Sequence, residues 1–314
     1  MKKIVCLGLV TADILIEPVP DEYLMKQDTI QVKNIQLCSG GDANNQAIAL
    51  AKMKKPVAIW GRVGADSFGI EAKNLLESSH VDTEHFVIDS SVETSVTAIL
   101  VTNDANRVFL HKPAGNNAFS LDLFPLSSLD DAAILAIGSL RALPGLPNEQ
   151  LIKLLQYAKS RSIITAADTT ADIFHLGSAA ILELLPWLDY FLPSETEAVE
   201  LTGKTDLAQA AEIFLSHGAG TVVIKLGSRG CYVKNRMEEF WVPALSVQAI
   251  DTTGAGDNFV AGFLAKLHEG ASLKECACAA VTAGSLSTTC IGASTASYTM
   301  GDIEDGIRIL TSNE

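Results

Sequence analysis

The sequence predicts an α/β fold in which a mostly parallel sheet is covered by helices on both faces and a small second β-sheet is attached. Short apolar runs of strand length alternate along the chain with segments of helical periodicity, a pattern typical of parallel sheets. Two stretches instead have strand periodicity without helices between them. The 314 residues are 48% hydrophobic and 19% charged, so the chain can bury a large core without disulfides or metal ions.

Six apolar runs are predicted to form the large sheet: residues 4–10, 57–63, 132–137, 163–167, 190–192 and 221–226. Helices are predicted between them over residues 43–53, 148–160 and 207–217. The first helix stops before Pro56 and the second follows Pro147. The third ends at Gly218, because a glycine can adopt the left-handed conformation of a helix cap.

Two more helices are predicted near the C-terminus. In the first of them, large apolar residues recur at helical spacing: Phe259, Val260, Phe263, Leu264 and Leu267. Gly270 ends this helix. Ser272 and Glu275 then form the capping-box pattern that opens the next helix.

The small sheet is predicted from runs at residues 29–37, 94–101 and 107–110, with a turn at residues 103–106. We interpret these runs as an antiparallel sheet that projects from the α/β body. The chain then divides into a body and a β lid. The body comprises residues 1–13, 39–93 and 112–314, and the lid comprises residues 14–38 and 94–111.

The charge of the chain argues against nucleic acid and membranes as partners. It has 23 basic and 37 acidic side chains, a net charge of −14 and a pI near 4.8, whereas nucleic acids are bound mainly by Lys and Arg. No apolar run approaches the ~18 residues of a membrane span. The six cysteines are scattered without a CxxC pair, which predicts a protein of the reducing cytoplasm.

The strongest chemical motif is the loop Asp251-Thr252-Thr253-Gly254-Ala255-Gly256-Asp257, directly before the predicted helix that contains Phe259. Its small residues let successive backbone amides point at one spot, and the helix N-terminus adds positive charge, so the loop can bind a phosphoryl group. Asp257 is either a helix-capping carboxylate worth ~1 kcal/mol or a general base that takes a proton from an attacking hydroxyl. The small residues before it favour the general base.

This loop closely resembles the second signature of the ribokinase-like carbohydrate kinases, the PfkB family. The first signature is similar to Ser39-Gly40-Gly41-Asp42-Ala43-Asn44-Asn45-Gln46-Ala47 and to Gly61-Arg62-Val63-Gly64-Ala65-Asp66-Ser67-Phe68-Gly69. The order and spacing of these motifs cover nearly the whole chain. The resemblance implies a ribokinase-like fold and ATP-dependent phosphorylation of a sugar hydroxyl. Asp257 is then the general base. The backbone of the loop Gly254-Ala255-Gly256-Asp257 supplies the anion hole, in which the amides of Ala255, Gly256 and Asp257 face the transferring group.

The sugar is expected between the body and the lid. Gly40 and Gly41 let a ligand approach the backbone, and Asn45 offers a donor and an acceptor to a polyol, although a tight turn with a capping Asn would look the same. Asp13 matches the sugar-binding aspartate of the family, with an ordinary loop residue as the alternative. Ser139 stands where the family has an acidic residue after the third predicted strand.

Two further departures leave the identity of the sugar open. Thr11 replaces a substrate-binding Asn of the family, and Asp42 replaces a Lys that follows the glycine pair. Ribose is therefore not implied. A phosphorylated substrate is disfavoured, because Asp42 would repel a second phosphate.

The resemblance also implies ATP and Mg²⁺. Ser194 and Glu197 occupy the place of an Asn-x-x-Glu motif, so that Glu197 would organise Mg²⁺ through water despite the Ser; the alternative is a solvated carboxylate at a helix end. Lys225, Gly227 and Gly230 resemble the segment that lies against the nucleotide, where a hairpin turn at Gly230 is equally compatible.

A monovalent cation is the last ligand implied. Residues 285–299 are similar to the region of the family that binds adenine and a monovalent cation, although composition alone would make them a polar loop. In that region Asp251 and the carbonyl of Thr253 are candidate ligands of K⁺.

Three rival functions are weighed. A nucleoside kinase would need an apolar slot for the base, for which Ile14, Ile16 and Phe109 are candidates. A non-catalytic family member would usually lack Asp257. A dehydrogenase is disfavoured because no G-x-G-x-x-G follows the first strand. The family resemblance also favours a homodimer formed through the lid.

Overall fold

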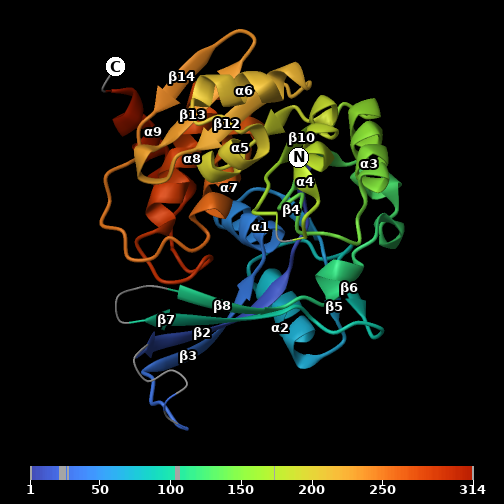
Figure 1. Ribbon diagram of the computed structural model, residues 1–314, viewed down its shortest axis with the longest axis vertical. Helices are drawn as coiled ribbons and strands as arrows, with labels where there is room; N and C mark the ends of the chain where they lie inside the picture. Colours follow the sequence, from blue (N-terminus) through green and yellow to red (C-terminus); the bar gives the residue numbers. More distant parts are fainter. Residues whose placement is uncertain (1, 21–25, 27, 103–106, 173, 313–314) are drawn as a thin grey trace.

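The large sheet of the computed structural model has eight strands and forms the centre of the α/β body (Figure 1). The structure describes residues 2–20, 26, 28–102, 107–172 and 174–312. In spatial order the strands are β14 (Glu239–Val242), β13 (Cys231–Asn235), β12 (Thr221–Lys225), β11 (Tyr190–Phe191), β10 (Ile164–Ala167), β9 (Ala132–Ile137), β1 (Lys3–Leu7) and β4 (Val57–Trp60). The six strands from β12 to β4 are parallel, and β13 and β14 add an antiparallel edge.

All six predicted strands exist. The predicted strand 57–63 is two strands, because Gly61 separates β4 from β5 (Arg62–Gly64), which pairs with β6 (Val87–Asp89) in a sheet of its own. Strands β13 and β14 were not predicted. They follow Gly230 directly, in a hairpin with β12.

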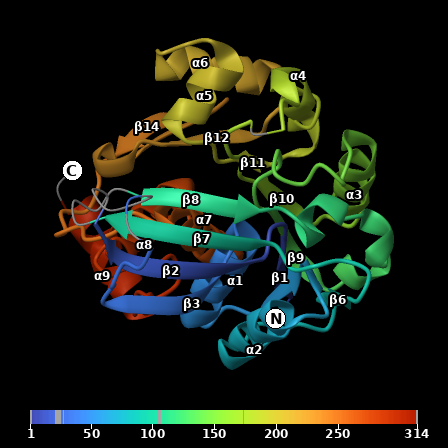
Figure 2. The same ribbon diagram turned by 60° about the horizontal axis from the view of Figure 1, so that its bottom comes forward.

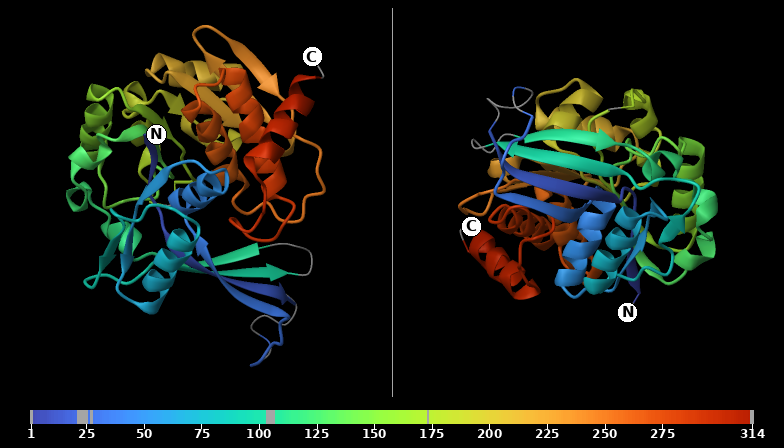
Figure 3. Two further views of the ribbon diagram at one scale, coloured as in Figure 1. Left: turned by 180° about the vertical axis from the view of Figure 1, so that it is seen from behind. Right: turned by 90° about the horizontal axis from the view of Figure 1, so that it is seen from below.

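Helices cover both faces of this sheet (Figures 1 and 3). Alternate side chains of a strand point to opposite faces, and Ile4 and Cys6 pack in one core while Val5 and Leu7 pack in the other. The first core contains residues of α1 (Asp42–Lys52), α2 (Ser67–Ser78), α7 (Ala255–His268), α8 (Leu273–Ser287) and α9 (Met300–Thr311). The second contains residues of α3 (Asn148–Ser160), α4 (Gly177–Leu182), α5 (Glu195–Thr202) and α6 (Leu207–Ser216).

The three helices predicted with both ends, over residues 43–53, 148–160 and 207–217, are confirmed to within one residue at each end. Helices α2, α4 and α9 were not predicted, and α5 was predicted only through the helix-end position of Glu197. Gly218 and Gly270 have the positive φ expected of helix caps. Ser272 and Glu275 form the predicted capping box. The described residues also contain five short 3₁₀ turns: η2 (Gly115–Ala118), η3 (Leu121–Leu123), η4 (Leu126–Leu129), η5 (Leu185–Trp187) and η6 (Gly227–Arg229).

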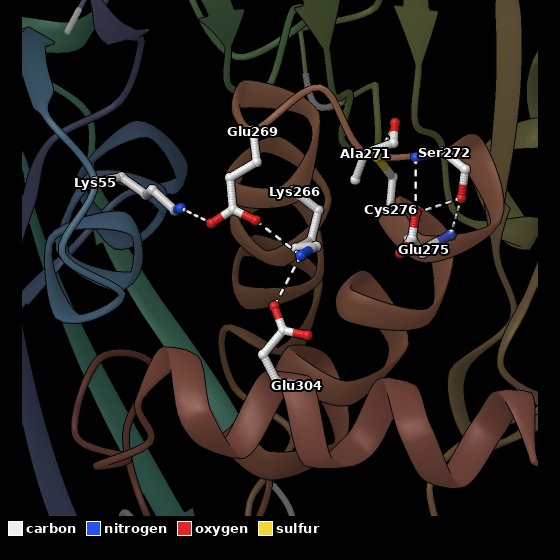
Figure 4. A network of polar contacts seen from close by, with 8 residues as sticks. All are labelled: Lys55, Lys266, Glu269, Ala271, Ser272, Glu275, Cys276 and Glu304. Atoms are coloured by element: carbon white, nitrogen blue, oxygen red, sulfur yellow. Dashed lines mark hydrogen bonds and ion pairs between the residues drawn. The ribbon is translucent and has the colours of Figure 1, made fainter.

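A polar network fastens the C-terminal helices together (Figure 4). Lys266, which is only 8% exposed, donates to Glu269 and to Glu304 of α9, both at 2.8 Å. Lys55, after α1, also pairs with Glu269. The network therefore joins α1, α7 and α9 at the end of α7 that is remote from Asp257.

The small sheet projects from the body and has four strands (Figures 1 and 2). Its order is β3 (Asn34–Gly40), β2 (Thr11–Val19), β7 (Val96–Thr102) and β8 (Arg107–Lys112). The hairpins β2–β3 and β7–β8 are antiparallel as expected, but the central pair β2–β7 is parallel. The prediction of an all-antiparallel sheet is wrong there, because both strands leave the body in the same direction. The predicted turn at residues 103–106 lies outside the described residues.

The two faces of this lid sheet differ in chemistry. Asp13, Thr97 and His111 lie side by side in register, so they share one face. The opposite face, which we call the outer apolar face, carries ten apolar residues: Ala12, Ile14, Ile16, Ile35, Leu37, Val96, Ala98, Leu100, Val108 and Leu110. Four of these are between 40% and 65% exposed, namely Ile35, Leu37, Val108 and Leu110.

Candidate active site

Asp257 lies in the first turn of α7, at the carboxyl end of the large sheet. The helix begins after Gly254, whose φ of 71° is left-handed and whose missing Cβ would lie 2.5 Å from the Cβ of Ala293. Glycine is therefore required at this position for two reasons. The tight turn places the amides of Gly256 and Asp257 at the helix N-terminus, where neither has an acceptor in the described part of the chain.

The Asp257 carboxylate is buried and held by one side chain. Only 7% of Asp257 is exposed, and its Oδ2 accepts a hydrogen bond from Nδ2 of Asn45 on α1 at 2.8 Å. Burial, and then the negative charge of Asp42, raise the pKa of Asp257 well above its ordinary value. A raised pKa is what a general base near neutral pH requires.

The carboxylates of Asp42 and Asp168 and the ammonium group of Lys225 surround Asp257. Lys225, at the end of β12, donates to Oδ1 of Asp168 at 2.6 Å, and both side chains are nearly buried. The Nζ of Lys225 also lies beside the loop, since a Cβ on Gly256 would be 3.8 Å from it. Burial, and then the charge of Asp168, raise the pKa of Asp42 to about 7. Lys225 is thus the cation that balances this group of acids.

Replacing Asp42 by Asn is expected to stabilise the protein at alkaline pH. The folded pKa of Asp42, about 7, lies above the ~3.9 of an unfolded Asp. Its contribution to stability is therefore present in full below about pH 4 and is lost as the pH rises to about 7. The side-chain amide of the variant does not titrate. We expect the two proteins to have similar free energies of unfolding at pH 4.5. At pH 8 we expect the free energy of unfolding of the variant to be ~1–2 kcal/mol higher than that of the wild type. A constant difference at all pH values would contradict this assignment.

Strand β2 of the lid sheet, which begins at Thr11 rather than at the predicted residue 14, contributes Asp13 to the same region. A Cβ on Gly40 would overlap the Asp13 carboxylate, 2.0 Å from its Oδ2, so Gly40 makes room for this side chain. Thr11 donates to Oδ1 of Asp13 at 2.8 Å. His111, which was not predicted as a site residue, lies on the same face and bonds to Thr97 through Nδ1 at 3.0 Å.

Ser139 follows β9 and is fully buried, with a left-handed φ of 55°. Its hydroxyl has no hydrogen-bond partner in the described residues. Gly138 before it packs against the start of α1, where its missing Cβ would lie 3.2 Å from the Cβ of Asp42. An orphaned buried hydroxyl at this edge of the sheet can bond to a ligand.

A cavity of about 470 Å³ opens on the other side of the loop. One end is polar and includes Lys225, Thr252 and the backbone at Gly256. The rest is lined by small and apolar residues: Gly227, Ser228, Gly230, Ala244, Leu245, Ser246, Val247, Ala249, Ala255, Phe259, Val281, Gly284, Ser285 and Thr288. The predicted residues Lys225, Gly227 and Gly230 thus meet the loop in one cavity, and the segment 244–249 was not predicted as its wall.

Ser194 and Glu197 form the capping box of α5. The amide of Ser194 donates to Oε2 of Glu197 at 2.7 Å, and the hydroxyl of Ser194 accepts from the amide of Glu197 at 3.3 Å. Burial, and then the charge of Asp168, raise the pKa of Glu197, while Lys225 opposes the rise. Glu197 therefore caps the helix and also lies near Lys225.

The carboxylate of Asp251 has three protein donors. It accepts from the amides of Thr253 at 2.7 Å and Gly292 at 2.8 Å, and it forms an ion pair with Arg107 of the lid. Arg107 was not predicted to reach this loop. The pairing of residues so distant in the chain has no local sequence signal.

Asp168 is another residue near the site that sequence analysis missed. It lies directly after β10, at the sheet edge where parallel strands end, and that position is a usable signal for a ligand-binding acid. The described residues contain no group of three or more His, Cys, Asp or Glu side chains placed to bind a metal ion. Within the same ranges, no helix combines the length and hydrophobicity of a membrane span.

Comparison with known proteins shows similarity over nearly the whole chain. The family model described as pfkB family carbohydrate kinase matches residues 1–300. A ribokinase of Haemophilus influenzae is 31% identical over 300 residues, which are 93% of this chain and 94% of the relative.

Two solved structures have the same fold. A putative ribokinase II of E. coli in complex with ATP and Mg²⁺ has a TM-score of 0.85 and 21% identity, covering 98% of this chain and 100% of the other. A double mutant of the fructokinase of Vibrio cholerae O395, bound to fructose, ADP and potassium, has a TM-score of 0.81 and 24% identity. That similarity covers 98% of both chains.

Proposed function

The chain belongs to the pfkB family of carbohydrate kinases, and from that premise we propose that it transfers the terminal phosphoryl group of ATP to a sugar hydroxyl. The observation that carries the proposal is the position of Asp257. Its buried carboxylate directly follows Gly256, which lines the cavity of about 470 Å³, and it lies among the charges of Asp42, Asp168 and Lys225.

Asp257 acts as the general base in this proposal. Asn45 holds its Oδ2, so the carboxylate has a fixed orientation toward an incoming hydroxyl. Proton transfer to a positioned base typically contributes ~10²- to 10⁴-fold in rate. Because the base must be ionised, turnover is expected to fall as the pH drops through the raised pKa of Asp257.

The anion hole rests on fewer amides than the sequence predicted. The amide of Ala255 already donates to the carbonyl of Thr252 at 3.2 Å, which leaves the amides of Gly256 and Asp257 for the transferring phosphoryl group. The positive φ of Gly254 positions them. Lys225 adds a point charge beside Gly256, and Gly227 and Gly230 line the cavity proposed for the rest of the nucleotide.

The residues fit a magnesium ion that is held mainly by phosphate and water. Mg²⁺ usually keeps several waters and needs only one or two carboxylates. Glu197 keeps one carboxylate oxygen outside the capping box, and Ser194 lies beside Lys225 across a β-bridge. We assign Glu197 to the ion through water. Bound Mg²⁺ would neutralise the charge on the transferring group.

The acceptor is proposed to lie under the lid, against Asp13, Gly40, Gly41, Asn45 and Ser139. Asp13 and the orphaned hydroxyl of Ser139 can bond to sugar hydroxyls. Asp42 and Asp168 make this pocket acidic, which favours a neutral sugar over a phosphorylated one. A cytoplasmic location is part of the same proposal.

The base slot that a nucleoside kinase would need is only partly present among its three candidates. Ile14 and Ile16 lie on the outer apolar face, away from Asp13, so they cannot line a pocket with it, whereas Phe109 lies on the same face as Asp13. The intact Asp257 and its partner Asn45 argue against a non-catalytic member.

The test is a coupled assay of ADP release with ATP and Mg²⁺ against pentoses, hexoses, sugar acids and nucleosides. We expect turnover with at least one neutral sugar. Turnover with nucleosides alone would assign the rival function, and ATP binding without turnover of any acceptor would favour a non-catalytic protein.

We also propose that the outer apolar face pairs two copies of this chain. Its exposed residues include Leu110 at 57% and Ile35 at 65%, on the edge strands β8 and β3. Replacing Leu110 by Lys is expected to shift the protein from dimer to monomer, because the charge would be buried between copies. Light scattering after size exclusion measures the mass. Met237→Lys, at a 91% exposed position after β13, is the matched control. A monomeric wild type would refute the proposal.

A further inference from the structure

A side chain of the lid already neutralises the carboxylate of Asp251. Arg107, at the start of β8, donates through Nη2 to Oδ1 of Asp251, and its Nη1 lies 3.5 Å from the hydroxyl oxygen of Thr252. Only 18% of the Arg107 side chain and 5% of the Asp251 side chain are exposed. The ion pair therefore joins the lid to the loop before α7.

Backbone amides use the other acceptor positions of Asp251. The amide of Thr253 donates to Oδ1 and that of Gly292 to Oδ2. Burial alone would raise the pKa of Asp251, but these two amides, the Thr253 side chain and then Arg107 lower it below its ordinary value. The negative charge of this carboxylate is balanced by the guanidinium of Arg107.

Carbonyl oxygens of the neighbouring loop also have protein donors. They belong to Ile291, Gly292, Ala293, Ser294 and Ala296. Lys52, at the end of α1, supplies two of these bonds through Nζ. A potassium ion is held by several oxygens that replace its water, and of the two predicted ligands only the carbonyl of Thr253 has no donor in the described residues. Each of these carbonyl oxygens still has a second lone pair, so the decisive contact is at Asp251, the predicted anionic ligand. The guanidinium of Arg107 already holds its Oδ1 and would repel a second cation there, so the residues present do not fit a bound potassium ion.

We propose that this chain needs no monovalent cation, because the guanidinium of Arg107 provides the positive charge at Asp251 that family resemblance assigns to potassium. The inference rests on the proposed kinase function. Asp251 holds Gly292, and the next residue, Ala293, packs against Gly254. Asn258 donates to the carbonyls of both Gly254 and Ala293, at 2.8 and 2.9 Å. Arg107 is thus a positioning residue for the loop that is proposed to bind phosphate.

The test compares KCl, NaCl and tetramethylammonium chloride at equal ionic strength. For the wild type we expect turnover and the affinity for ADP, measured by calorimetry, to differ by less than about twofold between the salts. Arg107→Met is expected to lose about tenfold in turnover in tetramethylammonium and to regain part of it in KCl, because an oxygen of Asp251 becomes available. Arg107→Lys keeps the charge and should recover most of the loss. Lys112→Met, on the same strand in an exposed ion pair, is the matched control.

Two results would overturn the inference. One is a wild type whose turnover or ADP affinity rises about tenfold when potassium replaces tetramethylammonium. The other is an Arg107→Met variant as active as the wild type without potassium. A protein that binds ADP equally in all three salts but phosphorylates no sugar would contradict the proposed function while supporting the inference, so the two failures are distinguishable.

Discussion

Asp257→Asn is expected to lower the turnover number by about 10³-fold or more while the affinity for ADP stays within about threefold. The amide has the size of the carboxylate but cannot take a proton from the attacking hydroxyl. The amides of Gly256 and Asp257 and the charge of Lys225 remain in place, so nucleotide binding is preserved. Steady-state kinetics and calorimetry measure the two quantities.

The folding of this variant can be checked by its thermal stability, which is expected to increase although its turnover falls. Burial and Asp42 disfavour the ionised form of Asp257, so removing its charge should raise the unfolding temperature increasingly as the pH rises and change it little at low pH. Asp305→Asn, the same chemical change on the exposed side of α9, is the control and should alter neither quantity. An Asp257→Asn enzyme with undiminished turnover would remove Asp257 from the mechanism.

Local patterns in the sequence were sufficient for the parts of the fold that depend on neighbouring residues. Strand runs, the glycine caps at Gly218 and Gly270, and the Ser272 capping box are all determined within a few positions. The parallel pairing of β2 with β7 was not predictable in this way. It depends on where two distant segments leave the body, and period-2 alternation is the same for both pairing directions.

Some residues of the candidate site can likewise be identified from local motifs, and others cannot. Asp257 and Asn45 each belong to a glycine-rich segment that opens a helix, so motifs identify them separately, although nothing local shows that they touch. Asp168 and Arg107 have no such motif. Their partners are 57 and 144 residues away, and those contacts follow from the order of strands in the sheet and the position of the lid.

Lys225→Met is expected to have the second largest effect, on both catalysis and stability. Burial alone would lower the pKa of Lys225, but Asp168 and Glu197 raise it above its ordinary value. Removing this ammonium leaves Asp168 buried without its 2.6 Å partner, which typically costs ~3–5 kcal/mol in the free energy of unfolding. The loss of a charge beside the transferring phosphoryl group should lower kcat/KM for ATP by about 10²-fold.

The two effects are separated by the double variant Lys225→Met with Asp168→Asn. Removing both charges of a buried pair restores most of the stability, because no uncompensated charge remains. Turnover should stay low, since the phosphate still lacks its cation. Lys225 also lowers the pKa of Asp257, so in Lys225→Met the acid limb of the pH profile of kcat/KM should move to higher pH. Recovery of turnover in the double variant would mean that Lys225 only stabilises the fold.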